Sequence, residues 1–142
     1  MDIPPASTPI VCDMADAPDT AGQRLEEYQR LLGQTLVSRE KTGQGIRFRL
    51  RADPGVLEWV RDLAAREKAC CAFFAFEVTV EGEEVLWDWA VSDDDVARAL
   101  LEEVYLLPGT ATRSLAELDD RLAGRGLRFT ADLSGVLRHV TD

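Results

Sequence analysis

Two adjacent cysteines, Cys70 and Cys71, are the residues of this 142-residue chain best suited to carry chemistry. Neighbouring cysteines bond to each other only with difficulty, because the short ring strains the backbone. Three interpretations are therefore open. The pair is plain core, since cysteine is among the most buried residue types. Or it binds a soft or borderline ion such as zinc, copper(I) or mercury(II), or it forms a redox disulfide with a third cysteine.

Cys12 is that third cysteine, and it lies beside Asp13 in a proline-rich segment. We expect Cys12 to lie near Cys70 or Cys71, because the apolar residues around it need a docking place and the strand after Cys71 offers one. Three thiolates with an open position suit zinc, mercury or arsenic(III). No CxxC pair is present and His139 is the single histidine, so zinc-finger spacing is absent.

The reactivity of the pair depends on opposing effects. The negative end of a helix raises the pKa of a nearby thiol, whereas the cations Arg66 and Lys68 would lower it. The sequence does not decide between these effects. A bound metal would deprotonate its ligands outright.

Other charged and aromatic patterns have simpler interpretations. The arginines that alternate through residues 46–51 are expected to pair with acidic residues on a solvated sheet face. Asp93, Asp94 and Asp95 precede a helix and suit its N-terminus. Trp87 and Trp89 share one strand face and are expected in the core.

No GxSxG, P-loop or GxGxxG motif and no acid–base constellation is present, so no catalytic or cofactor-binding residue is assigned.

The elements that must position the cysteines follow from periodicity. Residues 1–19 hold four prolines and read as an irregular arm, followed by a single domain over residues 20–142. The first expected element is a helix from Thr20 to about Leu32, which Gly33 weakens or ends. It is followed by a strand over 46–51, a helix capped by Asp53 and running to about 69, and a hairpin over 73–91. The next helix is capped by Ser92 or Asp93 and stopped by Pro108.

This order predicts an α+β domain with an antiparallel or mixed sheet of three or four strands. The central part suits a ferredoxin-like split β-α-β layout with helices packed on one face. Residues 112–142 are assigned a short helix from Ser114, a strand at 127–129 and a helix or strand at 136–140. This tail either completes the sheet or reaches a second subunit.

Composition excludes some partners. Lys and Arg number 16 and Asp and Glu 26, which gives a formal net charge of −10. Such a chain should repel phosphate backbones, so nucleic acid is not expected as a partner. No apolar stretch approaches the roughly 18 residues of a membrane span, and the N-terminus does not resemble a signal peptide. We therefore expect a cytoplasmic protein with reduced thiols and no membrane partner.

The segment over residues 66–76, REKACCAFFAF, resembles a segment of small uncharacterised proteins of high-GC bacteria. It is loosely similar to segments beside mercury-regulator-like proteins. The scarcity of lysine, with only Lys41 and Lys68 among the 16 basic residues, fits a GC-rich genome. The resemblance implies no particular activity, but it favours a link to heavy metals.

Two functions remain open. One is a small cytosolic protein that binds or senses a soft metal ion, such as zinc or mercury, through Cys70 and Cys71 with Cys12. The alternative is a non-catalytic homodimeric interaction domain whose cysteines are ordinary core residues. Counting the thiols that react in the native protein separates the two.

Overall fold

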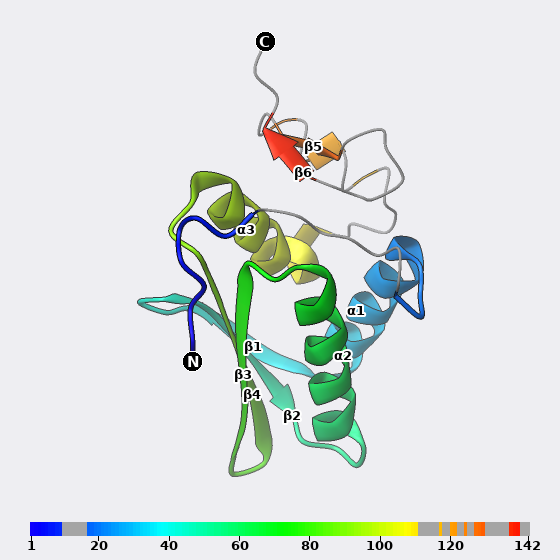
Figure 1. Ribbon diagram of the computed structural model, residues 1–142. Coiled ribbons are helices and arrows are strands. Elements are labelled where there is room, and N and C mark those ends of the chain that lie inside the picture. The colour runs from blue at the N-terminus through cyan, green and yellow to red at the C-terminus, as the bar shows by residue number, and fades with distance from the viewer. Residues whose placement is uncertain are drawn as a thin grey trace.

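The computed structural model describes residues 1–9, 17–110, 117, 120, 121, 124, 127–129 and 137–139. Its helices and strands are α1 (Ala21–Thr35), β1 (Leu36–Lys41), β2 (Gly45–Arg51), α2 (Val56–Cys70), β3 (Phe74–Glu81), β4 (Glu84–Val91), α3 (Asp95–Thr110), β5 (Leu127–Phe129) and β6 (Leu137–His139). Figure 1 shows α1 and α2 side by side next to the main sheet.

The main sheet has the strand order β1-β2-β4-β3, and every neighbouring pair is antiparallel. The α+β layout with a four-stranded sheet is confirmed, and so is the hairpin, which is β3 and β4. The ferredoxin-like order is not confirmed. The outer neighbour of β2 is β1, which precedes it in the chain and joins it as a hairpin, whereas that layout places a strand from beyond α3 there.

The hydrophobic core lies between the three helices and the inward face of this sheet. Alternation sets that face in β2, where Ile46, Phe48 and Leu50 are buried and the intervening arginines are not. Trp87 and Trp89 of β4 are 0% and 1% exposed, which confirms the prediction that they belong to the core.

The arginines of β2 form the ion pairs that alternation predicts for the outer face. Arg47 donates two hydrogen bonds to Asp88 of β4, at 2.7 and 3.1 Å. Arg49 reaches Glu40 of β1 at 3.0 Å. The row is therefore a paired sheet surface that links β2 to the strands on both sides.

α1 begins as predicted. Thr20 accepts a hydrogen bond from the Gln23 amide at 3.1 Å, and the Gln23 side chain accepts one from the Thr20 amide at 2.9 Å, which completes a capping box. The predicted end near Leu32 is too early, because the helix runs through Gly33 to Thr35. A single glycine costs a helix only about 1 kcal/mol relative to alanine, and packing of the following turn offsets it.

The predicted start of α2 is wrong by two residues. Asp53 accepts the Val56 amide through its backbone carbonyl, and its carboxylate lies 3.3 Å from Arg51 instead of capping the helix. The N-cap is Gly55, whose φ of 86° is a left-handed conformation that glycine adopts without strain.

α3 also differs at both ends from its prediction. The carboxylate of Asp94, rather than Ser92 or Asp93, accepts the amides of Val96 and Ala97, at 2.8 and 3.1 Å. The helix continues through Pro108 to Thr110.

The C-terminal strands β5 and β6 pair with each other and not with the main sheet. The predicted strand at 127–129 is confirmed, and the segment over 136–140 contains a strand rather than a helix. The helix predicted from Ser114 begins outside the described residues. Within the described part of the chain, no helix is long and apolar enough to cross a membrane.

Candidate thiol site

The cysteine pair lies at the C-terminal end of α2. Cys70 is the last residue of the helix and Cys71 is its C-cap, whose amide donates to the Glu67 carbonyl at 2.8 Å. Cys70 is 8% exposed and Cys71 is 3% exposed. Glu67 and Cys71 are four residues apart and therefore share a helix face, and the Cys71 Sγ lies 4.0 Å from Glu67 Oε1.

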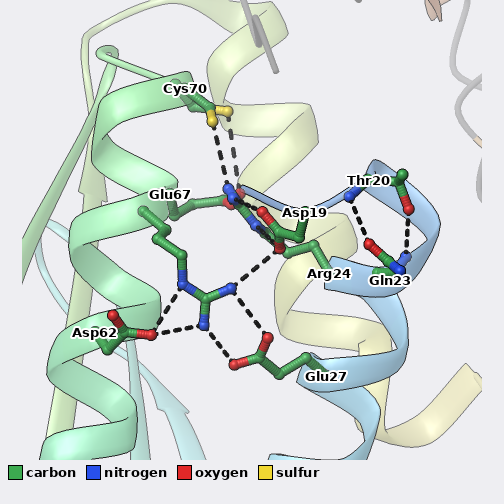
Figure 2. Close-up of polar contacts among 10 residues, drawn as sticks. Asp19, Thr20, Gln23, Arg24, Glu27, Asp62, Glu67 and Cys70 are labelled. Carbon is green, nitrogen blue, oxygen red and sulfur yellow. Dashed lines mark hydrogen bonds and ion pairs between the residues drawn. The ribbon is translucent and has the colours of Figure 1, made fainter. Parts of the chain in front are cut away.

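α1 contributes the cation of this site. The Arg24 side chain is only 4% exposed, and its Nη1 donates to Glu67 Oε2 at 3.0 Å and to Cys70 Sγ at 3.5 Å. Its other guanidinium nitrogens donate to both carboxylate oxygens of Asp19, at 2.6 and 3.0 Å. Each cysteine therefore contacts one member of a single Arg24–Glu67 ion pair, as the dashed contacts at Arg24, Glu67 and Cys70 in Figure 2 help to follow.

A second arginine, Arg66, links α1 and α2 through ion pairs. Arg66 of α2 reaches Glu27 of α1 at 2.5 Å, Asp62 of α2 at 2.8 Å and Asp19 at 3.0 Å. The Trp59 indole donates to Glu27 at 2.8 Å. Asp19 thus bridges Arg24 and Arg66, so the position of Arg24 beside the thiols is fixed by contacts on several sides.

The surroundings of the site keep Arg24 positively charged and raise the pKa of Glu67. Burial raises the pKa of the Glu67 carboxyl above its usual value, although Arg24 opposes the shift. Burial lowers the pKa of Arg24, but its hydrogen bonds to Asp19 and Glu67 outweigh that effect and raise it. Hydrogen bonding to Arg24 lowers the pKa of Asp19. The site therefore combines a permanent positive charge at Cys70 with a carboxyl near Cys71 that binds a proton more readily than usual.

Tyr28 completes the cluster and was not singled out by the sequence. It follows Arg24 by one turn on α1, is 7% exposed, and stacks on Trp87 with ring centres 5.9 Å apart. Its hydroxyl forms no hydrogen bond of strict geometry among the described residues, but it lies close enough to the Glu67 carboxyl for the two groups to shift each other's pKa. Burial raises the pKa of Tyr28 well above its ordinary value, and the negative charges of Glu67 and Cys71 raise it further.

The structure places Cys70 and Cys71 at one site but leaves Cys12 outside the described residues. The expected neighbourhood of Cys12 therefore stays a prediction. Within the described ranges, no group of three or more His, Cys, Asp or Glu residues is arranged to hold a metal ion. The cation at Cys70 is Arg24, whereas Lys68 donates to the backbone carbonyls of Ala72 and Phe74.

The sequence missed Arg24, Glu67 and Tyr28 as members of the site. The available signal was a pair of four-residue spacings, Arg24 to Tyr28 and Glu67 to Cys71, each of which places two polar groups on one helix face. What brings the two faces together is the packing of α1 on α2, which the spacing alone does not reveal.

Comparison with known proteins adds no relative. No family model matches the chain, and neither a curated protein nor a solved structure matches it.

Proposed function

We propose that this protein binds or senses a soft metal ion through the thiols of Cys70 and Cys71, with Cys12 as the candidate third ligand. One observation carries the proposal: both thiols of an adjacent pair lie at a single buried ion pair, 3.5 Å from Arg24 Nη1 and 4.0 Å from Glu67 Oε1 respectively. The resemblance of residues 66–76 to segments near mercury-regulator-like proteins points in the same direction.

The neighbours of the thiols suit the chemistry of binding. A thiol must lose its proton before it becomes a metal ligand. The Arg24 Nη1 donates to Cys70 Sγ at 3.5 Å, and the Glu67 carboxylate is placed to accept a proton from Cys71. Thiolates select soft or borderline ions, among them mercury(II) and zinc. Mercury(II) is satisfied by two thiolates, whereas zinc takes a fuller set that would draw on Cys12.

The test is a titration of the native protein with mercuric chloride, followed by calorimetry and by counting the thiols that stay reactive. We expect one ion per chain and the loss of two reactive thiols. Cys70→Ser and Cys71→Ser should each weaken binding by more than about tenfold, by analogy with the loss of groups that support a metal site. Cys12→Ser tests the candidate third ligand, and a similar loss there identifies Cys12 as a ligand.

The alternative, a non-catalytic homodimeric interaction domain with ordinary core cysteines, is favoured by the burial of both side chains, which are 8% and 3% exposed. Under that alternative, mercuric ion leaves both thiols untouched until denaturant is added, and the mass in solution is that of a dimer. A native protein whose thiols stay silent would therefore contradict metal binding.

The composition of the chain bears on the partners and the location proposed for this protein. The net charge of −10 argues against a nucleic-acid partner, and a cytoplasmic location would keep the thiols reduced and available to an ion. Binding of a random DNA duplex at moderate salt would count against the first.

A further inference from the structure

The edge of the main sheet at β3 carries backbone groups that the fold leaves unused. β3 ends the strand order β1-β2-β4-β3 and pairs with β4 alone, along its whole length from Phe74 to Glu81. In Figure 1 it lies at the front edge of the main sheet. An edge strand presents a row of amides and carbonyls to which another strand can pair, so proteins usually cover or blunt such an edge.

The hydrogen bonds at the start of β3 indicate which of its residues face outward. The Phe73 carbonyl accepts the Ser92 amide at 3.3 Å, so the bonds toward β4 fall on Phe73 and on every second residue after it. Phe74 faces the other way, because its amide donates to the Cys71 carbonyl at 3.1 Å and its carbonyl accepts from Lys68 Nζ at 2.6 Å. The outward groups of Phe74 are therefore already occupied.

The next three outward-facing residues are Phe76, Val78 and Val80. No described residue outside the sheet forms a hydrogen bond to their amides or carbonyls. Their side chains lie on the apolar face of the strand, where Phe76 and Val78 are half-buried and Val80 is 51% exposed. Glu77 and Thr79 are exposed on the opposite face. The open edge is thus a short strand with one apolar face and one polar face.

We propose that a second copy of this chain pairs with this edge, β3 against β3 in antiparallel orientation, with a two-fold axis at Val78. The two four-stranded sheets then form one continuous sheet across the dimer. A two-fold axis requires that the same surface serve both copies. This dimer is independent of the proposed metal binding, because it uses neither Cys70 nor Cys71.

The hydrogen-bonding groups select this register. With the axis at Val78, each Val78 faces the Val78 of the other copy, and each Phe76 faces a Val80. All three outward-facing residues then meet outward-facing partners, as the hydrogen-bonded pairs of an antiparallel ladder require. A shift of two residues in one direction brings Val80 opposite Phe74, whose groups are occupied. The opposite shift brings Phe76 opposite Gly82 in the turn.

The side chains favour the same register. On the apolar face it sets aromatic and β-branched side chains against each other, which pair well across strands. On the polar face it places Glu77 opposite Thr79 rather than opposite another carboxylate. Either two-residue shift sets carboxylates against each other, Glu77 against Glu77 or Glu77 against Glu81. Facing like charges are unfavourable, and the chain already carries a net charge of −10.

Sedimentation of the full chain over a range of concentrations, with a chelator present, tests the dimer. A contact through one strand edge is small, so we expect a dimer that dissociates at micromolar concentration. Val78→Pro removes the central amide, and proline is accepted in an edge strand where that amide faces outward. The variant should keep its pairing with β4 and its circular dichroism spectrum, and it should stay monomeric where the wild type is a dimer.

Thr79 offers a matched pair of variants that leave the backbone alone. Thr79→Glu sets a carboxylate opposite the Glu77 of the other copy, once on each side of the axis. It should weaken the dimer by about tenfold, the sum of two facing like-charge pairs. Thr79→Lys puts opposite charges at the same two places and should tighten the dimer instead.

Oxidative cross-linking reports the register. Facing residues of a hydrogen-bonded antiparallel pair have Cα atoms about 5.5 Å apart, which is within reach of a disulfide. Val78→Cys should therefore cross-link two copies through residue 78, as peptide mapping by mass spectrometry would identify. Val80→Cys is the matched control on the same face, because its two Cα atoms would lie more than about 13 Å apart and should not cross-link.

Other results overturn the inference. A chain that stays monomeric at high concentration leaves the edge to an extended segment of another protein. A dimer that survives Val78→Pro, or that cross-links as well through Val80→Cys as through Val78→Cys, lies on another surface or in another register. If Val78→Pro does not fold, equal affinities for Thr79→Glu and Thr79→Lys overturn the inference alone. None of these results touches the proposed metal binding, which the reactivity of the thiols decides.

Discussion

Arg24 is a buried cation shared by two carboxylates and one sulfur. Its side chain is 4% exposed, and those of its partners Asp19 and Glu67 are 14% and 15% exposed. Removing one member of such a cluster leaves the remaining charges without compensation in a poorly solvated place. The residue that positions the thiols is therefore also a residue on which the α1–α2 contact depends.

Replacing Arg24 by methionine should lower the free energy of unfolding by about 3 kcal/mol, because Asp19 and Glu67 would then be buried with their attraction lost. Urea unfolding monitored by circular dichroism measures the change. The matched control is Arg51→Met, since Arg51 is 57% exposed and its pair with Asp53 lies at the surface. A loss for Arg24→Met no larger than for Arg51→Met would show that the buried pairing contributes little.

Glu67 should give stability an unusual pH dependence. Its folded-state pKa is raised above the ordinary 4.5 by burial, so the folded chain holds this proton at a pH where the unfolded chain has released it. The contribution of Glu67 is therefore largest below pH 4.5 and falls as the pH rises through the folded-state pKa. The unfolding free energy of the wild type minus that of Glu67→Gln should therefore fall as the pH rises through this range.

Glu27→Gln is the control for that measurement, and we expect the contribution of Glu27 to stability to change with pH in the opposite direction. The hydrogen bond from Arg66 lowers the pKa of Glu27, so its contribution is present above pH 4.5 and is lost as the pH falls through the lowered value. Unfolding curves measured at a series of pH values on both variants give the pH dependence of each contribution to stability. A Glu67 contribution that grows with pH would mean that Arg24 holds the carboxylate ionised.

At the scale of elements, the contact between β2 and β4 depends on the absence of a side chain at Gly45. A Cβ there would lie 1.9 Å from the carbonyl oxygen of Trp89, which is a backbone atom that cannot rotate away. Gly45→Ala should therefore lower the unfolding free energy by about 1–3 kcal/mol, the usual range for overpacking. Gly43→Ala, where a Cβ meets nothing within 4 Å, should change it far less. Equal effects in thermal unfolding would contradict this account of the strand pairing.

The elements were predictable where their periodicity is strong. The alternation of residues 46–51 and of the hairpin, and the capping pattern at Thr20, led to the observed strands and helix start. β1 was missed because its sequence LVSREK shows no strict alternation, and its burial follows none. The start of α2 was missed because Asp53 and Pro54 resemble a helix start, whereas Gly55 adopts the left-handed conformation that opens the helix.

Only part of the candidate site could be predicted from the sequence, and the reason is physical. Adjacent cysteines stand out in a sequence, but Arg24 and Cys70 are 46 positions apart. Their contact depends on the docking of α1 against α2, and no local pattern reports such docking. Likewise, the approach of the Tyr28 hydroxyl to the Glu67 carboxyl is a property of the packed core and not of either residue.

At the scale of the whole molecule, the thiol site lies where three elements meet. α2 ends at Cys70, β3 begins three residues after Cys71, and α1 supplies Arg24 and Tyr28. A ligand held there would contact both α1 and α2, which the ion pairs of Arg24 and Arg66 join. Binding should accordingly be linked to the stability of the fold, since a ligand that binds only the folded state stabilises it.

Under the proposed function, Cys70 and Cys71 act together as ligands of one soft ion. X-ray absorption spectroscopy at the mercury edge, on protein loaded with one equivalent of mercuric ion, tests this most directly because it counts the sulfur neighbours of the metal. We predict at least two sulfur ligands in the wild type and in Cys12→Ser, and one fewer in Cys70→Ser and in Cys71→Ser. A wild-type spectrum with a single sulfur neighbour, or with only oxygen and nitrogen, would contradict the claim.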